Sequence, residues 1–215
     1  MAGLIFWDVD TQYDFMHADG KLYVPDAEHI IPNLERLTNH AHAEGIRVIA
    51  SADDHEPHHE EISDTPDFRT TFPRHCERGT RGQQKIAQTA LHDPLLIEPT
   101  PQDPMDIRRR VRVHASDILF HKHWFDVFTN PNVEPVLDEL DPEAIVVYGV
   151  ALDVCDRYAI DGLLVRRPNT SLALVTDAAK PIVAEAGERL IAEWRTRGVT
   201  MVTTDDVLAG AARGS

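Results

Sequence analysis

The chain has 215 residues, of which 42% are hydrophobic and 27% are charged, a composition typical of a folded globular protein and not of a disordered one. Its length suits a single domain, which we expect to span residues 1–215. With 21 basic and 36 acidic residues the net charge is −15, which argues against binding to nucleic acid because phosphate groups repel an acidic surface.

No apolar run approaches the ~20 residues that are needed to cross a bilayer. Near the N-terminus, Asp8, Asp10 and Asp14 stand where a secretory signal would need an apolar core. We therefore expect a cytoplasmic protein with no membrane contact. The two cysteines, Cys76 and Cys155, lie far apart in the sequence and do not indicate a disulfide framework.

Short apolar runs alternate with amphipathic stretches, a pattern typical of parallel strands joined by crossover helices. The runs expected to form strands are 3–7, 46–50, 118–120, 144–148, 172–175 and 199–202. Apolar residues at helical spacing predict one helix that ends near Gly45, one that follows Cys155, and one over 184–197. We predict an α/β fold with a doubly wound, mostly parallel six-stranded sheet and helices on both faces.

Chemically reactive side chains stand at the ends of four of these strands. In chain order they are Asp10, then Asp53 and His55, then Lys122, then Cys155. Ligands of open α/β sheets bind beyond the carboxyl ends of the strands, so these side chains should meet at one rim. No glycine-rich phosphate loop accompanies them, which removes the main support for nucleotide binding.

Cys155, at the expected start of a helix, is a candidate nucleophile because backbone N–H groups there lower a thiol pKa and can bind an oxyanion. Asp10 could accept the thiol proton and return it to a leaving amine, although Asp8 and Asp14 could do the same. Lys122 could keep such an acid ionised. Each residue alone has a structural alternative: an inert buried cysteine, a turn-forming acid or a solvated lysine.

The segment from Asp53 to about residue 86 is long, poorly periodic and rich in histidine, which is typical of a functional loop. Asp53, His55 and His75 offer mixed nitrogen and oxygen ligands that suit zinc, iron or manganese. Further candidate ligands in the same segment are His58, His59 and Glu61. A polar loop that is merely rich in histidine is the alternative interpretation.

Five motifs occur in a fixed order along the chain. They are D-x-Q-x-D-F at 10–15, D-x-H at 53–55, P-x-H-C-x-x-G-T at 73–80, a strand-end Lys122, and G-V-A-x-D-x-C at 149–155. In this order and spacing the sequence resembles the isochorismatase-like cysteine hydrolases, and among them most closely the nicotinamidases. The resemblance extends from the first strand to the helix that begins at Cys155.

The resemblance implies a role for each of several residues. The catalytic residues would be Asp10, Lys122 and Cys155. The oxyanion hole would be formed by the amides of Ala151 and Cys155, after a cis Val150–Ala151 peptide. The metal would be bound by Asp53, His55, Glu61 and His75, and the substrate ring would be flanked by Phe15 and Phe72. His59 is the alternative to Glu61 in the metal shell. The Q-x-D-F that follows favours Asp10 over Asp8. Phe72 stands where many relatives have tryptophan.

The implied activity is hydrolysis of nicotinamide to nicotinate and ammonia through a Cys155 thioester, with a divalent zinc, iron or manganese ion that positions the substrate ring. The partner would be a small amide, and the family suggests a homo-oligomer. One alternative is a relative that acts on another carboxamide, a ureide or isochorismate, although isochorismatase-type relatives lack the metal ligands. The other is a non-catalytic scaffold that binds metal or a partner through the histidine-rich loop.

Overall fold

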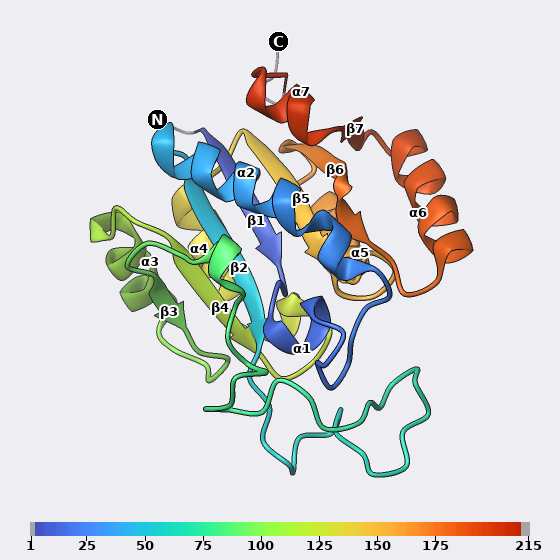
Figure 1. The fold of residues 1–215 in the computed structure, drawn as a ribbon. Coiled ribbons are helices and arrows are strands. Elements are labelled where there is room, and N and C mark those ends of the chain that lie inside the picture. The colour runs from blue at the N-terminus through green and yellow to red at the C-terminus, as the bar shows by residue number, and fades with distance from the viewer. Residues whose placement is uncertain (1–2, 212–215) are drawn as a thin grey trace.

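Seven parallel strands form the central sheet of the protein, which a computed structural model describes over residues 3–211 (Figure 1). The strands are β1 (Leu4–Val9), β2 (Arg47–Asp53), β3 (Leu95–Ile97), β4 (Ile118–Lys122), β5 (Ala144–Val150), β6 (Ser171–Lys180) and β7 (Thr200–Val202). Their order is β3-β4-β2-β1-β5-β6-β7, and each neighbouring pair is parallel. The predicted doubly wound α/β fold is confirmed, with a sheet that is wholly parallel.

The predicted count of six strands is one short. The additional strand, β3, has only three residues, pairs with β4 alone and leaves Leu96 38% exposed. So short a run at the edge of a sheet carries no periodicity that a sequence pattern can detect. Five other strands extend beyond their apolar runs: β1 reaches Val9, β2 reaches Asp53, β4 reaches Lys122, β5 reaches Val150 and β6 reaches Lys180.

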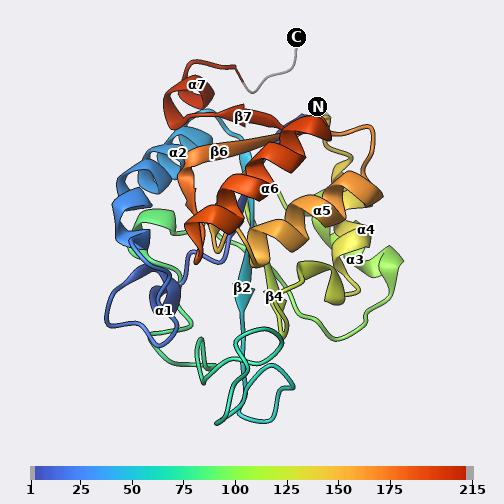
Figure 2. The same ribbon diagram turned by 90° about the vertical axis from the view of Figure 1, so that its right-hand side faces the viewer.

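Helices cover both faces of the sheet. They are α1 (Tyr13–Met16), α2 (Ile31–Ala43), α3 (Pro104–Val113), α4 (Val133–Leu140), α5 (Cys155–Arg166), α6 (Ala184–Thr196) and α7 (Thr204–Leu208), with short 3-10 helices η1 (Ala27–Ile30), η2 (Ala87–Thr89) and η3 (Val127–Thr129). Figure 2 shows α2 on one side of the sheet and α3, α4 and α5 on the other. Three helices, α2, α5 and α6, match the predicted ones. No helix in the described chain has the length and apolarity to cross a membrane.

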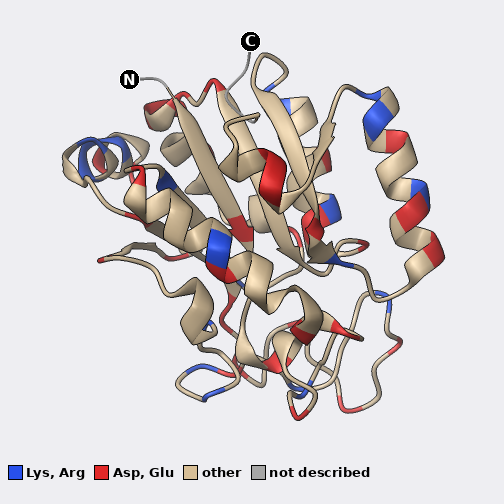
Figure 3. Ribbon diagram, turned by 45° about the horizontal axis from the view of Figure 1, so that its top comes forward, with Lys and Arg blue, Asp and Glu red and all other residues tan. Residues whose placement is uncertain are grey.

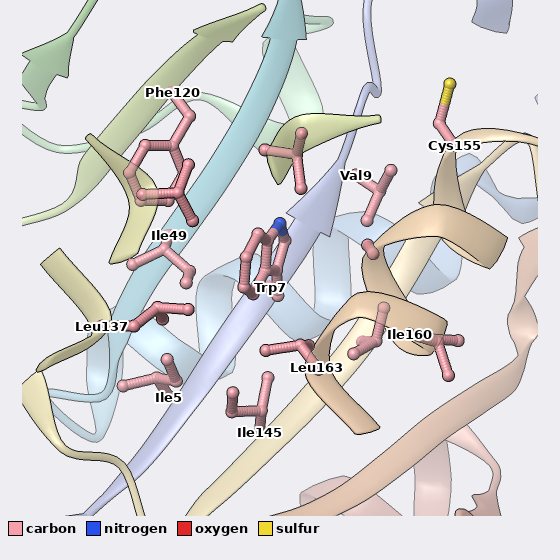
Figure 4. Close-up of a cluster of buried hydrophobic side chains, with 14 of the residues drawn as sticks. Ile5, Trp7, Val9, Ile49, Phe120, Leu137, Ile145, Cys155, Ile160 and Leu163 are labelled. Atoms are coloured by element: carbon pink, nitrogen blue, oxygen red, sulfur yellow. The ribbon is translucent and has the colours of Figure 1, made fainter. Parts of the chain in front are cut away.

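Alternation along β1 divides its side chains between two hydrophobic cores. Trp7 points to the face covered by α3 to α6, on the same side as Phe120 of β4 (Figure 4). The centroid of its ring lies 5.9 Å from that of Phe120 and 6.2 Å from that of Phe128 of η3. Phe6 points to the opposite face and meets Tyr148 of β5 edge-on. Because each large apolar side chain contributes roughly 1.5–3 kcal/mol when buried, the two cores hold the strand ends in fixed relative positions.

The strand order reverses beside β1, with β2 and β4 on one side and β5 to β7 on the other. In open α/β sheets such a reversal creates the crevice in which ligands bind. Gly149 allows β5 to approach β1 closely there: its φ is +136°, and a Cβ on it would lie 2.1 Å from the carbonyl oxygen of Val9.

The long connection over residues 54–86 lies beyond the carboxyl ends of the strands, as the teal to green segment at the bottom of Figure 1. It contains no helix or named strand, but isolated β-bridges join His55 to Glu77 and Ile62 to Phe72. The segment therefore folds back on itself next to the crevice.

Charged residues of both signs are interspersed along the ribbon (Figure 3). The arginine-rich α3 packs beside acidic α4, where Arg108 lies 2.6 Å from Asp138 and Arg112 lies 2.7 Å from Glu139. These pairs neutralise much of the positive charge that the sequence concentrates in α3.

Asp156, in the first turn of α5, is a fully buried carboxyl group whose oxygens have no hydrogen-bond partner among residues 3–211. Burial raises its pKa well above the ordinary value, and the carboxylates of Asp10, Asp8 and Asp153 raise it further. The folded protein therefore keeps a proton on Asp156 at a pH where the unfolded chain has released it. Such an acid costs stability as the pH rises above its unfolded pKa of about 4.

We predict that Asp156→Asn, which has the same shape but does not titrate, gains stability relative to the wild type as the pH rises from 4 to 8, by at most about 1.4 kcal/mol per pH unit. Urea denaturation of both proteins across this range measures the difference, in which the other titrating groups cancel. Asp156→Val should show the same pH dependence at a different absolute stability. A difference that stays constant with pH would show that Asp156 is ionised in the folded protein.

Candidate active site

Three residues predicted from the sequence meet at the carboxyl ends of neighbouring strands. Lys122 ends β4, Asp10 follows β1, and Cys155 begins α5 after β5. The Lys122 Nζ lies 2.9 Å from Asp10 Oδ2 and 3.8 Å from Cys155 Sγ. All three side chains are buried. The strand order β4-β2-β1-β5 thus gathers a lysine, a carboxylate and a thiol that are far apart in the sequence.

Two further polar residues hold the carboxylates of this site in place. Ser51 of β2 donates from Oγ to Asp10 Oδ1 at 2.7 Å. Gln12 bonds the backbone of Asp53 twice: its Nε2 donates to the carbonyl oxygen at 2.8 Å, and its Oε1 accepts from the amide at 2.7 Å. Sequence reasoning missed both roles. Alternation along β2 could have indicated Ser51, because residues two apart face the same side of a strand.

A second group of side chains converges beside the first. It consists of Asp53, His55, Glu61 and His75, which are all buried and which each offer a ligand atom within 4.8 Å of the others. His75 Nε2 lies 3.6 Å from both Asp53 Oδ2 and Glu61 Oε1. His55 Nε2 lies 3.8 Å and 3.9 Å from the same two oxygens. We call these four residues the metal-ligand cluster.

The donor atoms of the metal-ligand cluster fit a divalent cation. His75 donates from Nδ1 to the carbonyl oxygen of Pro73 at 2.7 Å, so the lone pair of this ring is on Nε2. Four polar atoms of the cluster are buried without a hydrogen-bond partner in the described chain: Nε2 of His75, both ring nitrogens of His55 and Oε2 of Glu61. Since buried polar atoms are rarely left unpaired, a cation held by two imidazoles and two carboxylates accounts for one nitrogen of each ring and for Oε2 of Glu61.

Burial disfavours the charged forms of two members of the metal-ligand cluster. It raises the pKa of Glu61 to about 8, with a further contribution from Asp53. It lowers the pKa of His55 to about 3, so this imidazole stays neutral. A bound cation would compensate the charge of Glu61 and use the free lone pair of His55.

The competing residues considered from the sequence have other partners. Asp8 accepts a hydrogen bond from Thr11 Oγ1 at 2.8 Å and lies 2.9 Å from Lys85 Nζ. His59 stacks its ring on His123, with centroids 3.9 Å apart, and lies outside the metal-ligand cluster. The structure thus groups Glu61, and not His59, with the other three candidate ligands.

Mutual interactions set the charges at the thiol. Burial disfavours the ammonium of Lys122, but Asp10 and Asp53 raise its pKa well above the ordinary value. Burial also disfavours ionised Asp53, yet Lys122 and the imidazoles lower its pKa. Burial raises the pKa of Asp10 and of Cys155, and Lys122 offsets this only in part. Lys122 and Asp53 are therefore both charged, and Cys155 rests as a thiol that needs a base.

The backbone beside Cys155 presents N–H groups without carbonyl partners. The Val150–Ala151 peptide is cis, as the family resemblance implied. Within residues 3–211, neither the Ala151 nor the Cys155 amide donates to a backbone carbonyl. Cys155 is also the first residue of the 12-residue α5, where the helix dipole is positive. Such amides next to a thiol can stabilise an oxyanion.

One small pocket, with about 370 Å³ of empty volume, reaches both the thiol and the metal-ligand cluster. Its polar lining comes from Cys155, Asp53, Glu61 and His75, and its apolar lining from Phe15, Phe72, Phe125, Leu22, Val24, Ala151, Val154 and Ile182. The predicted Phe15 and Phe72 are thus both at the pocket. Ala151 was predicted for the oxyanion hole, whereas Leu22, Val24, Val154 and Ile182 were missed because no pattern in their segments indicates a ligand.

Comparison with known proteins places this geometry in a family. The Isochorismatase domain matches residues 3–206. Similar solved structures include the zinc complex of pyrazinamidase from Pyrococcus horikoshii (22% identity, TM-score 0.71, covering 93% of this chain and 98% of that one) and the pyrazinamidase/nicotinamidase of Streptococcus mutans (21%, 0.70, 93% and 100%). Another is N-carbamoylsarcosine amidase of Thermoplasma acidophilum (22%, 0.69, 94% and 97%). No curated protein matches the sequence significantly. Because the family domain spans almost the whole chain, the protein belongs to the isochorismatase family of hydrolases.

Proposed function

We propose that the protein is a metal-dependent nicotinamidase, which hydrolyses nicotinamide to nicotinate and ammonia through a thioester on Cys155. The observation that carries this proposal is a pocket that both Cys155 and His75 line. A carboxamide can lie against the thiol while a nitrogen of the same small ring faces the metal ligands. Two solved relatives that are named as pyrazinamidases support the assignment.

The lining of the pocket favours a small, flat and uncharged substrate. Phe15, Phe72 and Phe125 line the pocket with aromatic rings, which offer flat apolar contacts to a ring of the substrate. No lysine or arginine of the described chain lines it. A substrate carboxylate would therefore be desolvated near Asp53 and Glu61 without a basic side chain to pair with. This disfavours isochorismate and N-carbamoyl amino acids as substrates.

In the proposed reaction Asp10 acts first as a base and then as an acid. It accepts the thiol proton of Cys155 while Sγ forms a bond to the carboxamide carbon. The amides of Ala151 and Cys155 hold the oxyanion. As the C–N bond breaks, Asp10 gives its proton to the departing ammonia and the thioester remains. A water molecule that loses a proton to Asp10 then hydrolyses the thioester, which releases nicotinate and restores the thiol.

Lys122 supports both charge states of this cycle. Its ammonium contacts Asp10 and lies 3.8 Å from Cys155 Sγ, so it stabilises the carboxylate before proton transfer and the thiolate during it.

The metal-ligand cluster would hold zinc, iron or manganese, because these ions accept mixed imidazole and carboxylate ligands. When bound, the ion would supply an electrophilic anchor for a ring nitrogen of the substrate. The zinc named in the P. horikoshii pyrazinamidase structure supports this choice of ion.

Ammonia release from the purified protein tests the proposed substrate. We expect turnover of nicotinamide and pyrazinamide, and a kcat/KM at least about 10²-fold lower for benzamide, which has the same shape but no ring nitrogen to anchor. N-carbamoylsarcosine should not be hydrolysed. Preferential hydrolysis of that compound would instead identify a ureide hydrolase. No release from any amide, together with an ordinary thiol reactivity of Cys155, would indicate a non-catalytic scaffold.

Replacement of the nucleophile should abolish turnover without unfolding the protein. We expect Cys155→Ala to lower kcat for nicotinamide by about 10⁴-fold or more, as measured by ammonia release, with an unchanged circular dichroism spectrum. Cys76→Ala is the matched control: burial raises the pKa of the Cys76 thiol, and only the backbone of this residue contacts Asp14, so most activity should remain. Wild-type turnover by pure Cys155→Ala would remove the nucleophile assignment.

Loss of the metal should damage substrate positioning and spare the thiol. Treatment with a chelator, or His55→Ala, should lower kcat/KM for nicotinamide by about 10²-fold. Alkylation of Cys155 by iodoacetamide should continue at nearly the wild-type rate, because Asp10 and Lys122 contact it directly. The control is His58→Ala, whose side chain is 73% exposed and outside the metal-ligand cluster. Full nicotinamide turnover by protein shown to be metal-free would disprove the positioning role.

A further inference from the structure

Asp14 is a buried carboxylate in α1 that the proposed reaction does not use. Its two oxygens accept backbone N–H groups from two different loops. Oδ2 accepts from Cys76 at 2.7 Å, and Oδ1 accepts from Lys21 at 3.1 Å. One side chain therefore ties together loops that are more than fifty residues apart in the sequence.

These two loops carry opposite parts of the pocket. Cys76 directly follows His75 of the metal-ligand cluster. The other loop continues into Leu22, which lines the pocket and whose N–H donates to the carbonyl oxygen of Asp14 at 3.2 Å. Phe15, next to Asp14, lines the pocket as well, and its ring lies 5.5 Å from that of His75. Asp14 thus joins the cluster to the apolar wall.

Two glycines let the chain approach Asp14 closely, one at its side chain and one at its backbone. A Cβ on Gly82 would lie 2.1 Å from Asp14 Oδ2, and a Cβ on Gly20 would lie 2.4 Å from the Asp14 carbonyl oxygen. A residue with a Cβ at either position would collide with Asp14, so glycine is required for this close packing. The close packing and the two hydrogen bonds of the carboxylate hold the two loops together.

We propose that Asp14 is a positioning residue that sets the spacing between His75 and the wall formed by Phe15 and Leu22, so that the metal and the substrate ring fit side by side. The inference deepens the proposed function and rests on it. A carboxylate is needed because it gives each loop an acceptor. Asparagine keeps one acceptor and turns its NH2 group against the other N–H donor.

The experiment compares the wild-type full chain with Asp14→Asn in three measurements. Competition with a chelator gives the zinc dissociation constant, ammonia release gives KM and kcat for nicotinamide, and peptide mass spectrometry gives the alkylation rate of Cys155 separately from Cys76. We expect zinc to bind about 10- to 100-fold more weakly, as for residues that orient metal ligands. KM should rise more than kcat falls, and the alkylation rate of Cys155 should stay the same.

Gly82→Ala tests the same contact with Asp14 intact, because the added methyl group displaces the carboxylate. It should weaken zinc binding in the same way, and it decides the matter if Asp14→Asn does not fold. Asp19→Asn, an exposed change in the same segment whose side chain bonds Tyr13, is the control and should leave zinc affinity unchanged.

Two results would overturn the proposal: folded Asp14→Asn and Gly82→Ala proteins that bind zinc as the wild type does, or an equal loss of zinc binding and Cys155 alkylation, which would mean a general loss of structure. If the wild type does not hydrolyse nicotinamide, the proposed substrate fails. The zinc and alkylation measurements then still decide the role of Asp14.

Discussion

One buried ammonium group organises the carboxyl rim of this sheet. Lys122 contacts the carboxylates of Asp10 and Asp53 together and faces Cys155. A lysine or a carboxylate removed from water alone is strongly destabilising, so each of these groups depends on the others for its charge. Asp53 of β2 and Lys122 of β4 are direct partners in the parallel pairing of these strands. The sheet itself therefore places their side chains next to each other, and no loop conformation is involved. The rigid sheet therefore supplies the spacing on which the thiol chemistry depends.

Asp53 connects the two halves of the site. Its Oδ1 contacts Lys122, and its Oδ2 faces His75 of the metal-ligand cluster. A cation bound there would partly neutralise the negative charge of Asp53, so that Lys122 would pair more strongly with Asp10. The apolar wall of the pocket lowers the local dielectric constant, which strengthens all of these interactions. A site with two chemical functions can thus be built around one shared carboxylate.

Much of this arrangement could be predicted because buried parallel strands give nearly continuous apolar runs, which the sequence displays clearly. The residues at the ends of such runs, Asp10, Asp53 and Lys122, must then lie along one edge of the sheet. β3 and the helix α3 escaped prediction for the opposite reason. β3 is too short to show alternation, and α3 is so rich in arginine that its two fully buried residues, Ile107 and Val111, form no visible stripe.

The sequence by itself determined which reactive side chains form the site and which strand ends they follow, since both depend on local composition and periodicity. Only the tertiary structure decided the partners within the long connection over 54–86, where Glu61 joins the metal-ligand cluster and His59 stacks on His123 instead. That segment has no period of its own. Its path depends on contacts between residues far apart in the chain, such as Asp14 with Cys76, and no local pattern encodes the distance between them.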